Sequence, residues 1–441
     1  MTDTVRGPED EVVRICQELI RIDTSNYGDG SGPGEAEAAA YVVAQLREVG
    51  LEPQTFESDP GRVSVAVRIP GADRRRGALC VHGHLDVVPA HAADWSVDPF
   101  AGEERDGCVW GRGAVDMKDM DAMMLAVLRD LARSGRRPPR DLVFAFFADE
   151  EAGGLKGSHW LVEHRRELFD GVTEAISEVG GYSLTVDGRD GDPVRLYLLQ
   201  TAEKGIAWLR LVAHGTAGHG SQINTDNAVT RLAAAVARIG THEWPIDITP
   251  TVRQFLDGVT EITGVEFDPA QPDQLLARLG TVARFVGATL RDTSNPTLLK
   301  AGYKHNVIPQ VAEAFVDCRF LPGHEDLVLG VVRELAGPQI DVQVHHRDIS
   351  LETGFDGALV EAMVAALQAE DPGAPVLPYC LSGGTDNKAL SLLGIRGFGF
   401  APLQLPTDLD FAAMFHGVDE RVPIQALQFG TRVLDRLLRT C

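Results

Sequence analysis

The sequence predicts an α/β protein whose main domain has a mainly parallel central sheet flanked by helices and is interrupted by an inserted α+β domain with an antiparallel sheet. Strand and helix signals alternate along 1–197 and resume over 350–441, as in folds built on a parallel sheet. Over 198–349, the expected strands alternate apolar and polar residues, as half-exposed antiparallel strands do. The run "LVFAFF" at Leu142–Phe147 is apolar throughout, which is typical of a strand buried on both faces.

Two helices are expected near the start of the chain, because apolar residues recur on one helical face from Val12 to Ile20 and again from Ala40 to Leu46. A third helix, at 120–135, is amphipathic and ends at Gly135, a residue suited to a helix C-cap. The strands expected in this part of the chain are 63–69, 78–86, 141–150 and 174–180.

In the inserted domain, strands are expected at 206–215 and 312–323, with a helix at 227–239 between them. The segment 241–300 is irregular and has no clear pattern. After the insertion, the main domain is expected to continue with a helix at 357–368, a strand at 395–402 and a final helix.

The composition is that of a soluble globular protein: of 441 residues, 44% are hydrophobic and 24% are charged. The net charge of −23 argues against nucleic acid or an anionic membrane as a partner. The six cysteines are widely spaced and form no C-x-x-C pair, which indicates a reducing compartment rather than a disulfide framework. The N-terminal segment lacks the features of a signal peptide and no apolar run is long enough to span a membrane, so a cytoplasmic location is expected.

Acidic and histidine side chains recur where the expected strands end or a helix begins, and these residues are His84, Asp116, Glu150, Glu151 and Glu178. Intervals of 32, 34 and 28 residues separate positions 84, 116, 150 and 178, each about the length of one βαβ unit. Ligands of open α/β sheets bind outside the carboxyl ends of the strands, so these side chains can converge there. A cluster of His, Asp and Glu without Cys or Lys predicts a divalent metal site.

The motif "HGHLDVVP" contains His84 and Asp86 two residues apart, on the same side of an extended chain. Asp86 can therefore hold the His84 imidazole in the tautomer that binds a metal. His82 shares that side, but one aspartate orients one ligand, which favours His84. Taken alone, the motif could also be a turn histidine with a capping aspartate, and Asp116 could be only a helix N-cap.

In "DEEAGG", the alternative to a functional site is an acidic loop, which fits poorly with the apolar run before it and the glycines after it. Two neighbouring glutamates allow one to bind metal while the other takes a proton from the water that the metal activates. His416, in "MFHGVDERVP", is a candidate for the remaining ligand, although a lone histidine there can also be structural.

Eight motifs, in this order, resemble those of one metallopeptidase family, which includes aminoacylase, acetylornithine deacetylase, succinyl-diaminopimelate desuccinylase and glutamate carboxypeptidase. The resemblance extends from about residue 12 to 435. The motifs are "HGHLDVVP", "WGRGAVDMKDM", "DEEAGG", "GTAGHGS", "NVIP", "DCRFLPG", "SGGTD" and "HGVDERVP".

This resemblance implies two zinc ions per subunit, held by His84, Asp116, Glu151, Glu178 and His416. It implies that Asp116 bridges the two ions, that Glu150 is the general base and later the acid, and that Asp86 supports His84. Histidine and carboxylate ligands also suit cobalt or manganese, so the metal stays open.

The inserted domain resembles the family's lid, through which a homodimer is expected. By this resemblance, His219 stabilises the oxyanion in the partner subunit's site, and Asn306 and Arg319 hold the substrate carboxylate. Gly384 and Thr385 resemble a wall of that pocket. Arg319 could instead pair with a neighbouring aspartate, and Thr385 could cap a helix.

Two stretches depart from the family pattern. After "DMK", where many members carry glycines, Asp119 and Met120 follow, and we interpret Asp119 and Asp121 as first-turn helix acids stabilised by the macrodipole. After "GGTD", where many members carry a small residue and Arg, Asn387 and Lys388 follow. The second departure touches the substrate pocket and leaves the substrate's identity open.

The resemblance implies a metal-dependent hydrolase that cleaves the amide bond of N-acyl amino acids or small peptides with a free carboxylate, as a deacylase, carboxypeptidase or dipeptidase does. The attacking group would be a dizinc-bound water activated by Glu150. Two alternatives remain: a two-metal phosphoesterase, because similar ligands serve that chemistry, and a catalytically silent metal-binding assembly protein. The preferred acyl group and side chain are not apparent from the sequence.

Overall fold

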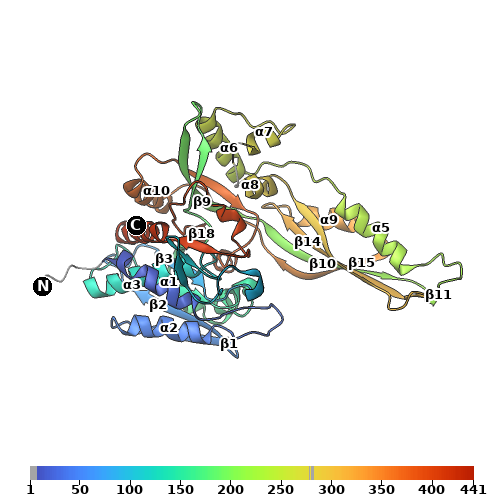
Figure 1. Cartoon of the computed structure of the whole chain (residues 1–441), viewed down its shortest axis with the longest axis horizontal. Helices are drawn as coiled ribbons and strands as arrows, with labels where there is room; N and C mark the ends of the chain where they lie inside the picture. The colour runs from blue at the N-terminus through green and yellow to red at the C-terminus, as the bar shows by residue number, and fades with distance from the viewer. Residues whose placement is uncertain (1–6, 278, 280–282) are drawn as a thin grey trace.

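The computed structural model describes residues 7–277, 279 and 283–441. The chain forms a rounded α/β body and an elongated antiparallel body that extends from one side of it (Figure 1). The predicted fold class, a helix-flanked central sheet with a separate antiparallel sheet, is confirmed.

Ten strands of the described residues form the central sheet, in the order β1-β2-β6-β3-β7-β18-β9-β16, with β8 and β17 also paired to β9. They are β1 (Gln54–Asp59), β2 (Arg62–Ile69), β3 (Ala78–His84), β6 (Leu142–Phe147), β7 (Val172–Ser177), β8 (Ser183–Asp187), β9 (Pro193–Glu203), β16 (Leu351–Glu352), β17 (Val376–Leu381) and β18 (Arg396–Gly399). Strands β6, β3, β7 and β18 are parallel, whereas β1 and β2 form an antiparallel edge. The carboxyl ends of β3, β6 and β7 therefore meet at one edge of the sheet.

Helices cover both faces of this sheet, as alternate residues of β6 show. Phe144 and Phe146 pack in the large core cluster with α1, α3 and α12, while Val143 and Ala145 pack in a second cluster with α4 and α11. The helices of this body are α1 (Val12–Ile20), α2 (Ala36–Arg47), α3 (Lys118–Ser134), α4 (Ser158–His164), α10 (Ala358–Glu370), α11 (Asn387–Ser391) and α12 (Ile424–Thr440). Among the described residues, no helix is long and apolar enough to cross a membrane.

Helix α3 ends as predicted, because Gly135 takes the left-handed conformation (φ 63°) of a C-cap. Asp119 and Asp121 do lie in its first turn, but they are buried, at 2% and 0% exposure, rather than solvated. Burial raises the pKa of both carboxyls well above the usual range. Burial, and not stabilisation of an ionised carboxylate by the helix dipole, therefore determines the state of Asp119 and Asp121.

The elongated body, called the lid below, contains the antiparallel sheet β12-β14-β10-β15 with α5 and α9 packed on one face. Its elements are β10 (Gly205–His214), β11 (Gly218–His219), α5 (Ala228–Gly240), β12 (Thr293–Ala301), β13 (Val307–Ile308), β14 (Val311–Phe320), α9 (Glu325–Ala336) and β15 (Ile340–Asp348). In β14 buried residues alternate with more exposed ones, as the sequence pattern predicts.

The segment 241–300, which the sequence left unplaced, contains α6 (Pro250–Thr263), α7 (Asp273–Leu276), α8 (Ala283–Thr289) and β12. Helix α6 packs against β17 of the central sheet, and Phe255 and Val259 join the core of the α/β body. Strand β9 remains in the central sheet up to Glu203, so the expected boundary at 197/198 lies inside a strand. The division into domains stays a prediction.

Candidate metal centre

The candidate ligands lie at the carboxyl edge of the central sheet. His84 is the last residue of β3, Glu178 follows β7 directly, and Glu151 lies in the turn after β6. Asp116 lies two residues before α3, and His416 lies in a loop near the C-terminal helix. Adjacent parallel strands thus bring together side chains that are far apart in the sequence.

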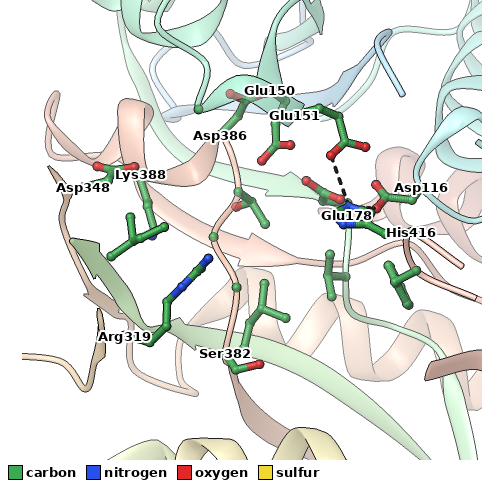
Figure 2. Close-up of a pocket in the computed structure, with 18 of the residues that line it drawn as sticks. Asp116, Glu150, Glu151, Glu178, Arg319, Asp348, Ser382, Asp386, Lys388 and His416 are labelled. Carbon is green, nitrogen blue, oxygen red and sulfur yellow. Dashed lines mark ion pairs between the residues drawn. The ribbon is translucent and has the colours of Figure 1, made fainter. Parts of the chain in front are cut away.

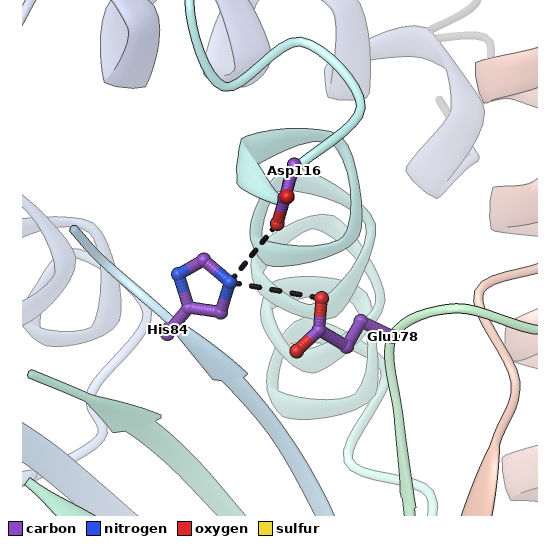
Figure 3. A group of neighbouring side chains, drawn as sticks. All are labelled: His84, Asp116 and Glu178. Carbon is purple, nitrogen blue, oxygen red and sulfur yellow. Dashed lines mark hydrogen bonds and ion pairs between the residues drawn. The ribbon is translucent and has the colours of Figure 1, made fainter. Parts of the chain in front are cut away.

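Two groups of potential ligand atoms share Asp116 (Figures 2 and 3). In the first, His84 Nε2 lies 3.1 Å from Asp116 Oδ1 and 3.7 Å from Glu178 Oε2. In the second, His416 Nε2 lies 3.3 Å from Asp116 Oδ2 and 3.1 Å from Glu151 Oε2. The ligand atoms of each group lie within 4.8 Å of one another. Asp116 presents one oxygen to each group, as a carboxylate that bridges two ions does.

Asp86 supports both a histidine and the acidic turn. His84 Nδ1 lies 2.9 Å from the main-chain carbonyl oxygen of Asp86 and 3.6 Å from its carboxylate. The carboxylate accepts hydrogen bonds from the N–H groups of Glu150 and Glu151, both at 3.1 Å. The carbonyl favours a proton on Nδ1 of His84, which leaves Nε2 as a ligand atom. The carboxylate orients the turn that carries the two glutamates.

His82 is separated from the cluster by its orientation. Its Nε2 atom lies 3.0 Å from Asn387 Oδ1, and its ring contacts Phe147 at a centroid distance of 5.3 Å. Burial lowers the pKa of His82 to about 4, so the ring is neutral at physiological pH. His84, and not His82, faces the acidic side chains.

Glu150 belongs to neither ligand group, but it lines the adjacent cavity. Its Oε2 atom lies 3.9 Å from His84 Nε2. Burial raises the pKa of Glu150 well above its usual range, and the carboxylate of Glu178 raises it further. A carboxyl group next to the ligand set rather than within it is suited to exchange a proton with a reacting water.

Acids outnumber bases in this cluster. Burial raises the pKa of Glu178 to about 8 and that of Asp386, which lines the same cavity, to about 7. Hydrogen bonds with Asp116 and Glu151 raise the pKa of His416 to about 10. Buried carboxylates repel one another and need more positive charge than two histidines supply. Because the donors are oxygen and nitrogen without sulfur, the set fits two divalent ions such as zinc, manganese or cobalt.

Three residues at the site adopt left-handed backbone conformations that side chains other than glycine rarely take. They are Asp149 (φ 67°), Val179 (φ 56°) and His416 (φ 57°). The hydroxyl of Tyr379 donates a hydrogen bond to the Val179 carbonyl and helps to hold that turn. Such conformations persist where the surrounding structure enforces them, often at functional sites.

Glu420, a residue that the sequence analysis did not single out, holds the loop that carries Asp116. Its side chain is fully buried. Oε1 accepts hydrogen bonds from the N–H groups of Val115 (2.7 Å) and Asp116 (3.1 Å). Oε2 accepts from Gly113 N–H (3.0 Å) and from the Arg112 guanidinium (2.7 Å). One carboxylate therefore fixes four donors of the Asp116 loop.

The same residue links this loop to the loop of His416. Glu420 lies four residues after His416 and directly before β19 (Arg421–Pro423), which pairs with β5 (Cys108–Trp110). Strand β5 also pairs with β4 (Glu103–Arg105). The motif "HGVDERVP" contains Glu420, but its main-chain partners lie up to 307 residues away, so no local pattern shows them.

A cavity of about 350 Å³ opens beside the ligand groups. Figure 2 shows the candidate ligands Asp116, Glu151, Glu178 and His416 on one side and Arg319, Lys388 and Asp348 on the other. Arg319 pairs with Asp317 at Nε–Oδ1 2.7 Å and Nη2–Oδ2 3.1 Å, the alternative considered from the sequence, and it lines the cavity as well.

Gly384 and Thr385 form part of the cavity wall. The Thr385 hydroxyl donates to Glu203 Oε1 at 2.6 Å, and its oxygen accepts the Asn387 N–H at 3.2 Å, at the start of α11. The hydroxyl is therefore engaged within the protein, and Glu203, which the sequence did not single out, supports this part of the wall without lining the cavity.

His219 and Asn306 lie together at the far end of the lid (Figure 1). The N–H group of Gly220 donates to the Asn306 carbonyl at 2.9 Å, and His219 Nδ1 lies 2.8 Å from Ser221 Oγ. Both residues are exposed, and neither is among the described residues that line the cavity. Within one chain, the structure thus brings Arg319 to the cavity but not Asn306 or His219.

A mixed α/β domain with an antiparallel lid, and with a shared carboxylate–histidine cluster beside a cavity at the sheet edge, defines a metal-dependent hydrolase. The chain belongs to the peptidase family M20/M25/M40, whose sequence model matches residues 80–440. The resemblance identified from the sequence motifs is thereby confirmed.

Relatives cover the chain almost completely. It is 28% identical to the N-fatty-acyl-amino acid synthase/hydrolase PM20D1 of Xenopus tropicalis, over 97% of this chain and 85% of the relative. It is 26% identical to aminoacylase-1 of Homo sapiens, over 99% of this chain and 97% of the relative. The structure of the M20 metallo-carboxypeptidase Sso-CP2 of Sulfolobus solfataricus superposes with a TM-score of 0.73 at 18% identity, over 98% and 99% of the two chains.

Replacing Glu420 by Gln tests whether its hydrogen bonds hold the loop that carries Asp116. The amide nitrogen would face N–H donors, so the Asp116 loop should loosen and zinc affinity should fall by about 10–100-fold, as for other groups that support metal ligands. Chelator competition measures the affinity, and circular dichroism checks the fold. The matched control is Glu370→Gln, because Glu370 is likewise an arginine-paired carboxylate, bound to Arg432 and Arg436, but away from the site. A folded Glu420→Gln protein with unchanged zinc affinity would contradict this role.

Proposed function

We propose that this chain hydrolyses the amide bond of N-acyl amino acids or small peptides that carry a free carboxylate. The observation that carries the proposal is the shared Asp116, whose two oxygens face two ligand groups beside a cavity that also contains Glu150. The names of two relatives, an N-fatty-acyl-amino acid hydrolase and an aminoacylase, support the substrate class.

One divalent ion would be held by His84, Asp116 and Glu178, and the other by Asp116, Glu151 and His416. A pair of such ions supplies Lewis acidity for the attacking water and the scissile carbonyl. Glu150 accepts the proton of the attacking water at a carboxylate oxygen and delivers it to the leaving amine. Zinc is the proposed metal, and cobalt or manganese suit the same donors.

Arg319 is the proposed anchor for the substrate carboxylate, because it lines the cavity across from the ligand groups and a guanidinium matches a carboxylate. Asp317 takes two of its contacts, at Nε and Nη2, so a substrate would meet the remaining N–H groups. Gly384 and Thr385 are the proposed wall beside the substrate.

His219 and Asn306 would complete the site of a partner subunit. The lid exposes Ile223 (97%) and Tyr303 (83%), large apolar side chains of the kind that subunit interfaces bury. We therefore propose a homodimer formed through the lid. In it, His219 donates a hydrogen bond to the oxyanion in the other subunit, and Asn306 helps to hold the carboxylate there.

Metal-stripped protein, reloaded with zinc, cobalt or manganese, tests the reaction class with N-acyl amino acids, dipeptides and aryl phosphates. We expect metal-dependent hydrolysis of the acyl amino acids or dipeptides and none of the phosphates. Phosphate release without amide hydrolysis would favour the two-metal phosphoesterase. No turnover with any metal would favour the catalytically silent protein.

Glu150→Gln should keep bound metal but lose most turnover, because the change removes a proton acceptor and not a ligand. General acid–base catalysis contributes about 10²–10⁴-fold, so a loss of at least that order is expected in kcat. The neighbouring Glu151→Gln is the matched control and should lose metal, since Glu151 faces His416. Metal analysis and steady-state kinetics separate the two variants. Loss of metal in Glu150→Gln, or a near-normal rate, would reject the assignment.

Mixing two inactive variants tests whether His219 acts across a dimer. A preorganised oxyanion donor is worth about 10²–10³-fold, so His219→Ala should be nearly inactive while still binding metal. If His219 acts in trans, each mixed dimer with Glu150→Gln has one site with both residues intact. Random re-pairing of equal amounts should then restore about a quarter of wild-type activity, because about half of the dimers are mixed.

The variants are unfolded together and refolded, and size is measured alongside activity. Each variant refolded alone is the control for the yield of refolding. If His219 acts within its own chain, every site in the mixture carries one lesion and no activity returns.

A further inference from the structure

Lys388 is a buried cation on the side of the cavity across from the ligand groups (Figure 2). It is the second residue of α11 and only 2% exposed. Its ammonium group lies against Gly384, where an added Cβ would come within 2.5 Å of Nζ. The absence of a side chain at Gly384 therefore gives the ammonium its place at the cavity wall.

The Lys388 ammonium has few partners for a buried charge. Nζ donates one hydrogen bond, to the Lys204 carbonyl at 2.9 Å, and no carboxylate of the described residues lies within 4.0 Å of it. The other buried lysines, Lys118 and Lys204, each donate to two carbonyl groups. Because an ammonium has three donors and buried donors without acceptors are costly, Lys388 has donor capacity left for a ligand.

The two acids that interact with Lys388 electrostatically, Asp348 and Glu203, are engaged with other residues. Asp348 Oδ2 lies 3.8 Å from His159 Nε2. Glu203 accepts the N–H and O–H groups of Thr385, at 3.0 Å and 2.6 Å. Burial raises the pKa of Glu203, and the charge of Lys388 is the largest of the influences that lower it, but Glu203 forms no ion pair with Lys388 within 4.0 Å. The acids therefore balance the charge of Lys388 from a distance and leave its remaining donors free for a ligand.

Arg319 lies on the same side of the cavity as Lys388 in Figure 2 but belongs to a different body. Arg319 is in β14 of the lid, and Lys388 is in α11 of the α/β body. Arg319 is itself partly neutralised by Asp317. A carboxylate held there by both cations would gain charge-assisted hydrogen bonds from each body.

We propose that Lys388 is the second anchor of the substrate carboxylate and acts together with Arg319 across the boundary between lid and α/β body. Lys388 is thus a specificity-determining residue that favours a free carboxylate over an amide at this position. The inference rests on the proposed function, since it assigns a contact to that substrate.

The alternative is that Lys388 only stabilises the fold. The two roles predict opposite effects of Lys388→Met, which keeps the length of the side chain and removes the charge. A structural lysine would lower the melting temperature when replaced. If Lys388 serves binding, its burial costs folding free energy, so replacing it should leave the melting temperature unchanged or raise it while substrate binding weakens.

The test compares zinc-loaded wild type, Lys388→Met and Lys388→Gln on N-acetyl-L-methionine and its C-terminal amide. For the acid, we expect KM to rise about 10–100-fold in both variants, the range for a lost hydrogen bond to a charged group, with kcat changed less than about 3-fold. For the amide, kcat/KM should not change. Lys156→Met is the control for loss of one positive charge, because Lys156 is half-exposed and pairs with Asp59 outside the cavity.

Calorimetric binding of the same two compounds, in a Glu150→Gln background, separates failure of the inference from failure of the proposed function. Turnover by wild type with an unchanged preference for the acid in Lys388→Met would overturn the role of Lys388 and leave the function standing. Binding of the acid that is lost in Lys388→Met, without turnover by wild type, would support the anchor and overturn the function. If wild type shows no binding and no turnover, both the anchor and the function are overturned. If Lys388→Met is less stable but binds the acid normally, the anchor alone is overturned.

Discussion

The site depends on the free energy of holding several carboxylates together away from water. Asp116, Glu150, Glu151 and Glu178 line one cavity edge, and burial, together with the neighbouring carboxylates, raises the pKa of Glu178 to about 8. Such a cluster is stable in its ionised form only if cations lie among the oxygens. The need for positive charge explains why these few residues suit a pair of divalent ions. The surrounding structure must direct their oxygens to a common place although the oxygens repel one another.

Much of the neighbouring structure serves that positioning. Asp86 uses its carbonyl for the His84 ring and its carboxylate for the Glu150–Glu151 turn, and Glu420 gathers the N–H groups before α3. The two carboxylates accept hydrogen bonds from main-chain N–H groups, and such bonds are strong where the carboxylate is ionised. The candidate ligands are therefore positioned by the backbone of loops at the sheet edge, supported by side chains from distant parts of the chain.

The site is formed by both the α/β body and the lid. The ligand groups lie in the α/β body, whereas Arg319 and Asp348 come from the lid, which continues from β9 through Lys204 into β10. Lys204 donates to the carbonyls of Ala288 and Arg291, so this connection is held in place. A ligand that bridges the bodies would couple substrate binding to their relative position. The far end of the lid, with His219, lies away from its own cavity, which is why a partner subunit enters the proposal.

The sequence by itself determined the α/β class, several of the strands and helices, and the convergence of His84, Asp116 and Glu178, because periodicity and βαβ spacing follow from backbone geometry. Its motifs also offered His416 as a candidate ligand and one of two neighbouring glutamates as a base. The resemblance to a family assigned the base to Glu150 and the ligand to Glu151. Only the tertiary structure decided that His82 turns to Asn387 and that Lys388 is a buried cation at the cavity. It alone placed α6 on the central sheet and connected Glu420 with residues up to 308 positions away. Contacts of this kind depend on how distant segments pack, and no local pattern of residues specifies them.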